Sequence, residues 1–167
     1  MAEEVMNSMN YTGSETKPKI SVRTPLLSEV LAKVHSAKTK PQKVKILKEN
    51  DSPALRQICK WSFDPKIVSA LPEGAPPYIV NEAPEGTEHE LLRRIGDKLY
   101  RFCKGGDDSL QQTRREQLFV QILESLHKDE AELLINTKDK KLHQIYKGFS
   151  HAVVKEAFGW NDDYVQV

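Results

Sequence analysis

The sequence lacks every common signature of catalysis or cofactor binding. It has no glycine loop for phosphate, no dinucleotide-binding G-x-G-x-x-G, no metal-binding H-E-x-x-H and no G-x-S-x-G nucleophile turn. Its histidines never come near a cysteine or serine in a familiar catalytic arrangement. We therefore expect a protein that is not an enzyme and has no catalytic residue.

Cysteine is scarce as well, because Cys59 and Cys103 are the only two. Two cysteines are too few for a disulfide framework or a cysteine-based zinc site, so we expect half-buried reduced thiols, as in cytosolic proteins. The nearest metal signal is Glu124-x-x-His127, the carboxylate–histidine spacing of di-iron bundles. Those bundles need a second such pair and two more glutamates, which are not found, so we expect no metal and no cofactor.

Neither sign of charge is in excess, and no long apolar run is present. The 25 Lys and Arg residues balance 24 Asp and Glu residues, so attraction of the whole chain to nucleic acid or to an anionic membrane is not implied. No apolar run approaches the ~20 residues of a membrane span, and the acidic start MAEEVMNSMN is not a secretory signal. The 167 residues, 38% of them apolar, fit one ordinary globular domain with no membrane partner.

What the chain does contain is apolar residues at helical spacing. No segment shows the alternation of a half-buried strand, so the fold class is predicted as all-α, an irregular bundle of about seven short helices. Residues 1–23 are polar and lack the helical spacing, so we expect a flexible N-terminal arm before a single helical domain over 24–160 and a tail over 161–167. The expected helices cover residues 25–36, 40–49, 53–62, 88–104, 110–126, 130–137 and 151–158.

Capping residues and apolar stripes set these boundaries and the core. The expected caps are Thr24, Thr39 with Gln42, Thr87 with Glu90, Ser109, Asp129 and Ser150. The expected core consists of Leu31, Leu55, Ile58, Leu92, Ile95, Leu99, Phe119, Ile122, Leu123, Leu126, Leu134 and Val154.

Proline is concentrated where the helical spacing stops. Residues 71–87, LPEGAPPYIVNEAPEGT, carry two copies of Pro-Glu-Gly, each of which we interpret as a type II turn. Loops of this length in compact domains are usually functional or linkers, and the two prolyl turns predict an ordered loop. Either the loop holds apolar side chains out to a protein partner, or it folds back and plugs the bundle. The candidate partner-binding residues in it are Pro76, Pro77, Tyr78 and Ile79.

Two further features each allow two interpretations. Trp160 and Tyr164, beyond the last helix, form either a latch on the core or an exposed contact for a partner. The basic residues form either solvated faces or two surfaces that follow a phosphate backbone. The first cluster is Lys38, Lys40, Lys43, Lys45 and Lys48, and the second is Lys138, Lys140, Lys141 and Lys147.

Several segments together resemble an uncharacterised family of T4-like tailed phages, especially cyanophages. They are LPEGAPPY, APEGTEH, CKGG, RREQLFVQILESLHKDEAELLI, KDKKL, YKGF and VVKEAFG, within about residues 36–160. The resemblance implies a viral origin and an accessory protein of unknown function, located in the host cytoplasm or in the virion. It supplies no catalytic residues.

Our leading hypothesis is a non-enzymatic phage accessory protein that binds a protein, either a virion component or a host protein, through the arm, the proline loop or both. The alternative is a nucleic-acid-binding accessory factor of phage replication or transcription, acting through the two lysine clusters. A single continuous face for both clusters would favour nucleic acid, and divergent clusters would favour protein.

Overall fold

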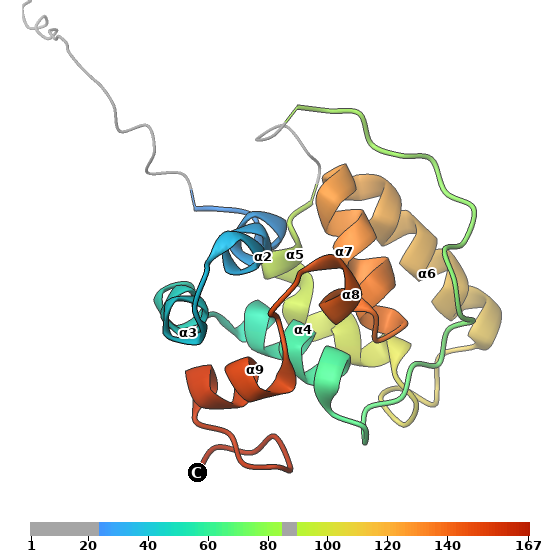
Figure 1. The fold of residues 1–167 in the computed structure, drawn as a ribbon. Helices are drawn as coiled ribbons and strands as arrows, with labels where there is room; N and C mark the ends of the chain where they lie inside the picture. Colours follow the sequence, from blue (N-terminus) through green and yellow to red (C-terminus); the bar gives the residue numbers. More distant parts are fainter. Residues whose placement is uncertain (1–23, 85–89) are drawn as a thin grey trace, which may run out of the picture.

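The fold is built from eight α-helices within residues 24–84 and 90–167, the parts of the chain that the computed structural model describes (Figure 1). Over these residues the only β pairing is two isolated bridges, Ser69 with Cys103 and Trp160 with Gln166. The prediction of an all-α bundle is therefore confirmed. The expected arm over residues 1–23 lies outside the described residues.

The helix bounds agree with the predicted spans at most places. The elements are α2 (Leu27–Ser36), α3 (Lys40–Glu49), α4 (Pro53–Phe63), α5 (Leu92–Ile95), the 3-10 helix η4 (Gly96–Phe102), α6 (Gln112–Ser125), α7 (Lys128–Lys138), α8 (Leu142–Ile145) and α9 (His151–Phe158).

Local caps fix α3 and α9 where the sequence predicted them. Thr39 Oγ1 accepts from Gln42 N at 3.3 Å, and Gln42 Oε1 accepts from Thr39 N at 3.2 Å, which completes the capping box. Ser150 Oγ accepts from Val153 N at 3.3 Å, and Gly159 ends α9 in the left-handed conformation at φ 66°.

Two other predicted caps are wrong. The Ser109 hydroxyl donates to Asp107 Oδ1 at 2.5 Å within a turn, and α6 begins after Gln111 with no side-chain cap. Helix α7 begins after His127, whose Nδ1 accepts from Asp129 N at 3.1 Å. At α7 the neighbouring His127 takes the role that the pattern assigned to Asp129, whereas at α6 no side chain takes the role assigned to Ser109.

Glu130 supplies a long-range acceptor at two helix starts, where Glu29 and Glu90 supply local ones, to Leu26 N at 2.7 Å and to Leu91 N at 2.9 Å. The side chain of Glu130 is buried on α7, where Oε2 accepts from Leu27 N and Oε1 accepts from Leu92 N, each at 3.0 Å. Helix α2 begins at Leu27 rather than after Thr24, and α5 begins at Leu92 rather than near residue 88. The other predicted cap, Thr87, lies outside the described residues.

The single α-helix expected over 88–104 is instead a short α-helix, α5, followed directly by the 3-10 helix η4. A Cβ on Gly96 would lie 2.6 Å from Ala54 Cα, so α4 and the start of η4 pack backbone to backbone. In a 3-10 helix every third residue lies on one side, and the buried side here is Gly96, Leu99 and Phe102.

The core follows the predicted apolar stripes with few exceptions. Of the residues named in advance, all but Ile122 are buried, and Ile122 is half-buried against the core cluster. Cys59 is completely buried rather than half-buried, whereas Cys103 is half-buried, and both are free thiols. Burial raises the pKa of Cys59, and it raises the pKa of Cys103 to about 11.

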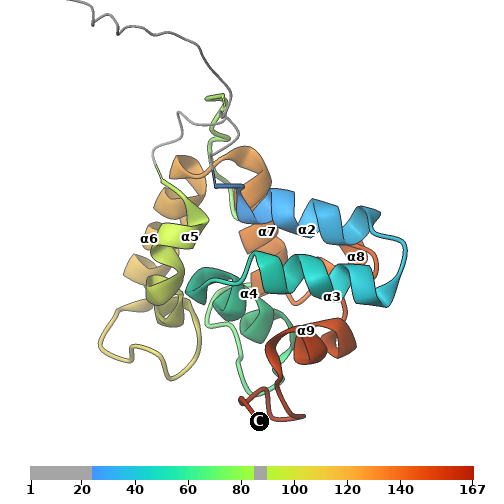
Figure 2. The same ribbon diagram turned by 90° about the vertical axis from the view of Figure 1, so that its left-hand side faces the viewer.

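Helix α4 occupies the middle of the bundle. It packs on α5, η4 and α7, while α3 packs between α2 and α9 on one side, as the turned view shows (Figure 2). On the opposite side α6 packs on α7. The segment after α4 runs along the outside of α6 (Figure 1), and this arrangement sets the proline loop against α6 and α7.

Candidate functional site

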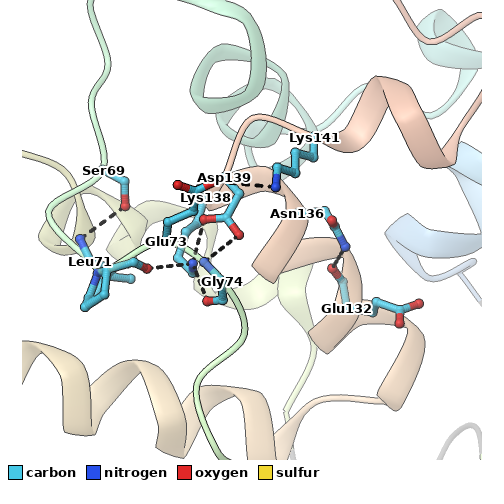
Figure 3. Close-up of polar contacts among 10 residues, drawn as sticks. Ser69, Leu71, Glu73, Gly74, Glu132, Asn136, Lys138, Asp139 and Lys141 are labelled. Carbon is cyan, nitrogen blue, oxygen red and sulfur yellow. Dashed lines mark hydrogen bonds and ion pairs between the residues drawn. The ribbon is translucent and has the colours of Figure 1, made fainter.

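The first turn of the proline loop is fastened by a buried ion pair at the end of α7 (Figure 3). Lys138 Nζ donates to Pro72 O at 2.9 Å, to Gly74 O at 2.7 Å and to Asp139 Oδ1 at 2.7 Å. Asp139 Oδ2 accepts from Gly74 N at 3.1 Å. The side chains of Lys138 and Asp139 are 1% and 6% exposed, so both charges are removed from water with their hydrogen bonds made.

Gly74 has φ +91°, a conformation that glycine adopts without steric cost. The predicted type II turn led by Pro72 is wrong, because it needs positive φ at Glu73, and Glu73 does not have it. Glu73 forms a more exposed ion pair with Lys141 at 3.4 Å. The second Pro-Glu-Gly copy cannot be compared in the same way, because Glu85 and Gly86 lie outside the described residues.

Farther along, the loop is held by the end of α6. Glu124 Oε2 accepts from Ile79 N at 2.8 Å, and Asn81 Nδ2 donates to Ser125 O at 3.5 Å. The loop therefore has no regular secondary structure, yet its backbone is held by Lys138 and Asp139 at residues 72–74 and by Glu124 of α6 at Ile79, and the Asn81 side chain binds the end of α6. This is the ordered loop that the two prolines predicted.

The two interpretations of the loop apply to different side chains. Tyr78 is half-buried against the core cluster, and burial, followed by the charge of Glu132, raises the pKa of its phenol. Ile79 points the other way and is 78% exposed. Pro76 is half-buried and Pro77 is exposed. Tyr78 thus acts as the plug, while Ile79 and Pro77 are presented to solvent.

A cleft of about 630 Å³ lies between this loop and α6. Residues 71–77 form one wall, and Thr113, Glu116, Gln117, Val120 and Gln121 of α6 form the other, with Phe119 and Lys138 between them. Of the charged residues on the walls, Lys138 is paired with Asp139 and Glu73 with Lys141, which leaves Glu116 as the lining charge with no ion pair among the described residues. The cleft is a mainly apolar channel with one such carboxylate on its α6 wall.

Trp160 and Tyr164, the other candidate contacts, are buried. They are 7% and 4% exposed, and their rings pack with centroids 6.2 Å apart. Val167 N donates to Gly159 O at 2.9 Å, which folds the tail over 161–167 back on the end of α9. This arrangement favours the latch over the exposed contact.

Three lysines of the two basic clusters bind backbone carbonyls instead of facing solvent. Lys43 Nζ donates to Val34 O at 2.6 Å and Ala37 O at 2.7 Å, at the end of α2. Lys140 Nζ donates to Trp61 O at 2.6 Å and Asp64 O at 3.0 Å, at the end of α4. With Lys138 fastening the loop, these cations neutralise helix C-termini and turns, and they are not available for phosphates.

The lysines of the second cluster do not lie together. Lys147 lies beside the first cluster, with its carbonyl oxygen 3.4 Å from Lys43 Nζ, whereas Lys138 and Lys141 turn toward the proline loop. Among the others, Lys40 pairs with Glu156 and Lys45 with Glu49 at the surface. Lys38 and Lys48 are exposed. By the criterion stated above, these lysines form neither one continuous face nor two separate ones, so the criterion favours neither protein nor nucleic acid.

Glu124 and His127 are not arranged as a half-site for a metal. Glu124 accepts a hydrogen bond from the loop backbone at Ile79 N. The imidazole of His127 caps the start of α7, where it accepts from Asp129 N. Over the described ranges, no three His, Cys, Asp or Glu side chains are grouped closely enough to hold a metal ion. No helix in those same ranges is both long and apolar enough to cross a membrane.

The sequence reasoning missed the residues that fasten the loop. Lys138 and Asp139 read as part of a solvated basic stretch, and nothing in that stretch signals burial. Glu124 was considered only as a metal ligand. The signal that could have found them is the expected order of the loop. Each fixed backbone N–H and C=O in an ordered loop needs a hydrogen-bond partner, and polar side chains elsewhere in the chain can supply it.

Comparison with known proteins places the chain in one family. The family model described as "Family of unknown function (DUF6433)" matches residues 30–144, and the chain belongs to that family. No curated protein and no solved structure matches it.

Proposed function

We propose that this member of the family is a non-enzymatic protein-interaction module that holds an extended segment of a partner protein in the cleft between residues 71–77 and α6. The observation that carries the proposal is the fastening of the loop. A segment without secondary structure is locked by Lys138, Asp139 and Glu124, and it forms one wall of a cleft. Loops positioned by a rigid scaffold are common binding elements.

The rigidity of the loop supports binding on energetic grounds. Ordering a loop on association costs about 0.5–1.5 kcal/mol for each immobilised side chain, and a loop that is already fixed avoids much of that cost. Ile79 adds an apolar contact at the surface because it is 78% exposed while its backbone N–H is held by Glu124. The module can therefore bind without refolding.

The lining of the cleft indicates the chemistry of the partner segment. Leu71, Pro76 and Val120 offer apolar surface, and Glu116 supplies negative charge, whereas Glu73 is paired with Lys141. An extended segment with apolar side chains and at least one Lys or Arg complements both properties. A partner segment rich in carboxylates would be repelled.

The resemblance of LPEGAPPY and the associated segments to proteins of T4-like phages supports a viral setting for this module. In that setting the partner is a virion component or a host protein, and the chain acts in the host cytoplasm or within the virion. The N-terminal arm over residues 1–23 remains a second candidate contact.

Site-specific photo-crosslinking tests the cleft. A photoreactive amino acid replaces Gln117 in the cleft or, as the matched control, the exposed Gln144 on α8, in the full chain expressed in infected host cells. We expect Gln117 to crosslink to one partner segment far more strongly than Gln144. Equal or absent crosslinking at the two positions would contradict the proposal.

The crosslinked segment is then made as a synthetic peptide and titrated calorimetrically against variants. Val120→Lys fills the cleft and repels a basic side chain, so we expect at least about a tenfold loss of affinity, equivalent to about 1.4 kcal/mol. Val165→Lys makes the same change at an exposed position in the tail and should leave affinity unchanged. Equal affinity for both variants would remove the cleft from the binding surface.

A further inference from the structure

A second surface, formed by basic residues that belong to neither lysine cluster, lies on α5 and η4. Residues 93–106 contain five basic side chains, Arg93, Arg94, Lys98, Arg101 and Lys104, and one acidic side chain, Asp97. The whole chain carries a net charge of only +1, so this short segment is strongly biased toward one sign. Figure 2 shows α5 at the edge of the bundle beside α6, away from α3 and α9.

The 3-10 geometry of η4 sorts these residues into rows. With three residues per turn, side chains three apart lie one above another. Gly96, Leu99 and Phe102 form the buried row, so the two other rows face outward. One contains Lys98 and Arg101, and the other contains Asp97 and Tyr100.

Tyr100 is unusual among the aromatic side chains because it is 52% exposed. Lys104 is also exposed and follows η4, where its backbone N–H donates to Val68 O at 2.7 Å. The bridge between Ser69 and Cys103 holds this end of the segment to the rest of the fold. Tyr100, on the row with Asp97, and the cations Lys98 and Arg101, on the neighbouring row, are thus both on outward rows of η4, with Lys104 after its end.

These cations differ from the lysines that cap helix ends. Within residues 24–84 and 90–167, the side chains of Lys98, Arg101 and Lys104 make no ion pair or hydrogen bond, and all three remain available to a ligand. Arg94 is partly neutralised by Glu90 at 3.8 Å, and Arg93 turns toward Thr24 O at 3.4 Å. The surface thus centres on Lys98, Arg101 and Lys104.

We propose that the outer face of η4 binds single-stranded nucleic acid, with Lys98, Arg101 and Lys104 on successive phosphates and Tyr100 stacked on a base. Charge complementarity selects a polyanion. The exposed ring selects a strand with unpaired bases, because every base offers a face for stacking and a duplex hides those faces. This surface is separate from the cleft, so either proposal can fail alone.

The test measures fluorescence anisotropy of a labelled oligodeoxythymidylate titrated with the full chain. Three phosphate contacts on a single strand predict about a 20-fold weakening between about 50 and 200 mM salt. The triple variant Lys98→Glu, Arg101→Glu, Lys104→Glu should lose nearly all binding. The matched control Lys38→Glu, Lys48→Glu, Lys147→Glu changes the net charge equally at exposed sites elsewhere, and it should retain most of the affinity.

Tyr100 provides a test that charge alone does not satisfy. Tyr100→Ala should weaken binding by about tenfold or more, and Tyr100→Phe should restore it, because the ring and not the hydroxyl stacks on the base. Circular dichroism and thermal melts of each variant show whether the fold is retained.

Four outcomes would overturn the proposal. They are no binding by the wild-type chain, equal losses in the two triple variants, tighter binding to duplex than to single strand, or no difference between Tyr100→Ala and Tyr100→Phe. The proposal would also be rejected if heparin competed for the site and Tyr100→Ala had no effect on binding. Those two results together would mean that the surface binds polyanions in general.

Discussion

Replacing Lys138 with methionine tests whether the buried ion pair holds the proline loop. Methionine keeps much of the aliphatic stem but removes the ammonium, which donates to Pro72 O, Gly74 O and Asp139 Oδ1. Asp139 then stays buried and negative, with Gly74 N as a remaining donor at 3.1 Å. Removing one partner of a buried pair leaves an uncompensated charge, which is far more costly than removing an exposed pair.

The expected loss of unfolding free energy for Lys138→Met is about 3–5 kcal/mol. If the loop detaches and lets water reach Asp139, the loss falls toward the lower end of that range. Adding Asp139→Asn should restore part of the stability, because it removes the unpaired charge. Lys45→Met is the control: its ion pair with Glu49 is exposed and 3.9 Å long, so its loss should be below about 1 kcal/mol.

Equilibrium urea denaturation measures these differences, and amide hydrogen exchange shows where they arise. In Lys138→Met the amides of Gly74 and Ile79 should exchange faster than in the wild type, while those of α3 change only with global stability. A loss below about 1 kcal/mol with unchanged exchange at Gly74 would refute the reasoning, because it would mean that the ion pair does not fasten the loop.

Three other perturbations probe the fold. Leu123→Ala should cost about 2–5 kcal/mol in denaturant titration because Leu123 is completely buried, and a value below about 1 kcal/mol would mean that the site collapses without leaving a cavity. Gly96→Ala places a Cβ 2.6 Å from Ala54 Cα, so it should lower unfolding free energy by about 1–3 kcal/mol, and an unchanged melting temperature would count against this packing. Burial raises the pKa of Tyr146 from 10.0 to about 12, so the unfolded state ionises first and stability is lost as pH rises between those values. Tyr146→Phe should make that alkaline decline in stability shallower in pH-dependent melts. Below about pH 9 the slope of stability against pH should be the same in the variant and the wild type.

Helices with local signals could be predicted from the sequence. The capping pair Thr39 and Gln42 and the cap Ser150 use atoms only three residues apart, so α3 and α9 begin where the pattern places them. The apolar stripes likewise identified the core, because burial of a helix face depends mainly on spacing along that helix. The ordered loop followed from its prolines.

The helix starts at Leu27 and Leu92 could not be predicted in this way. At both, the N–H of the first helical residue is bound by the carboxylate of Glu130, which lies 103 residues from Leu27 and 38 from Leu92 along the chain. A glutamate in the first turn of α7 looks like an ordinary dipole-favouring residue until the three helices are packed together. The long predicted helix over 88–104 is instead divided into α5 and η4 at Gly96, where the chain packs against Ala54 of α4, a contact that the local pattern does not contain.

In the candidate site, too, some features follow from local sequence signals and others only from long-range contacts. The sequence by itself determined that an irregular, proline-rich segment interrupts an all-α chain, because turn residues and helical spacing act over a few neighbouring positions. Only the tertiary structure decided that Tyr78 packs inward while Ile79 faces out, and that Lys138 belongs to a buried anchor and not to a basic surface. A lysine reads the same in the sequence whether its ammonium meets water or two carbonyls some 65 residues away, and that choice depends on which backbone groups the folded chain leaves without partners.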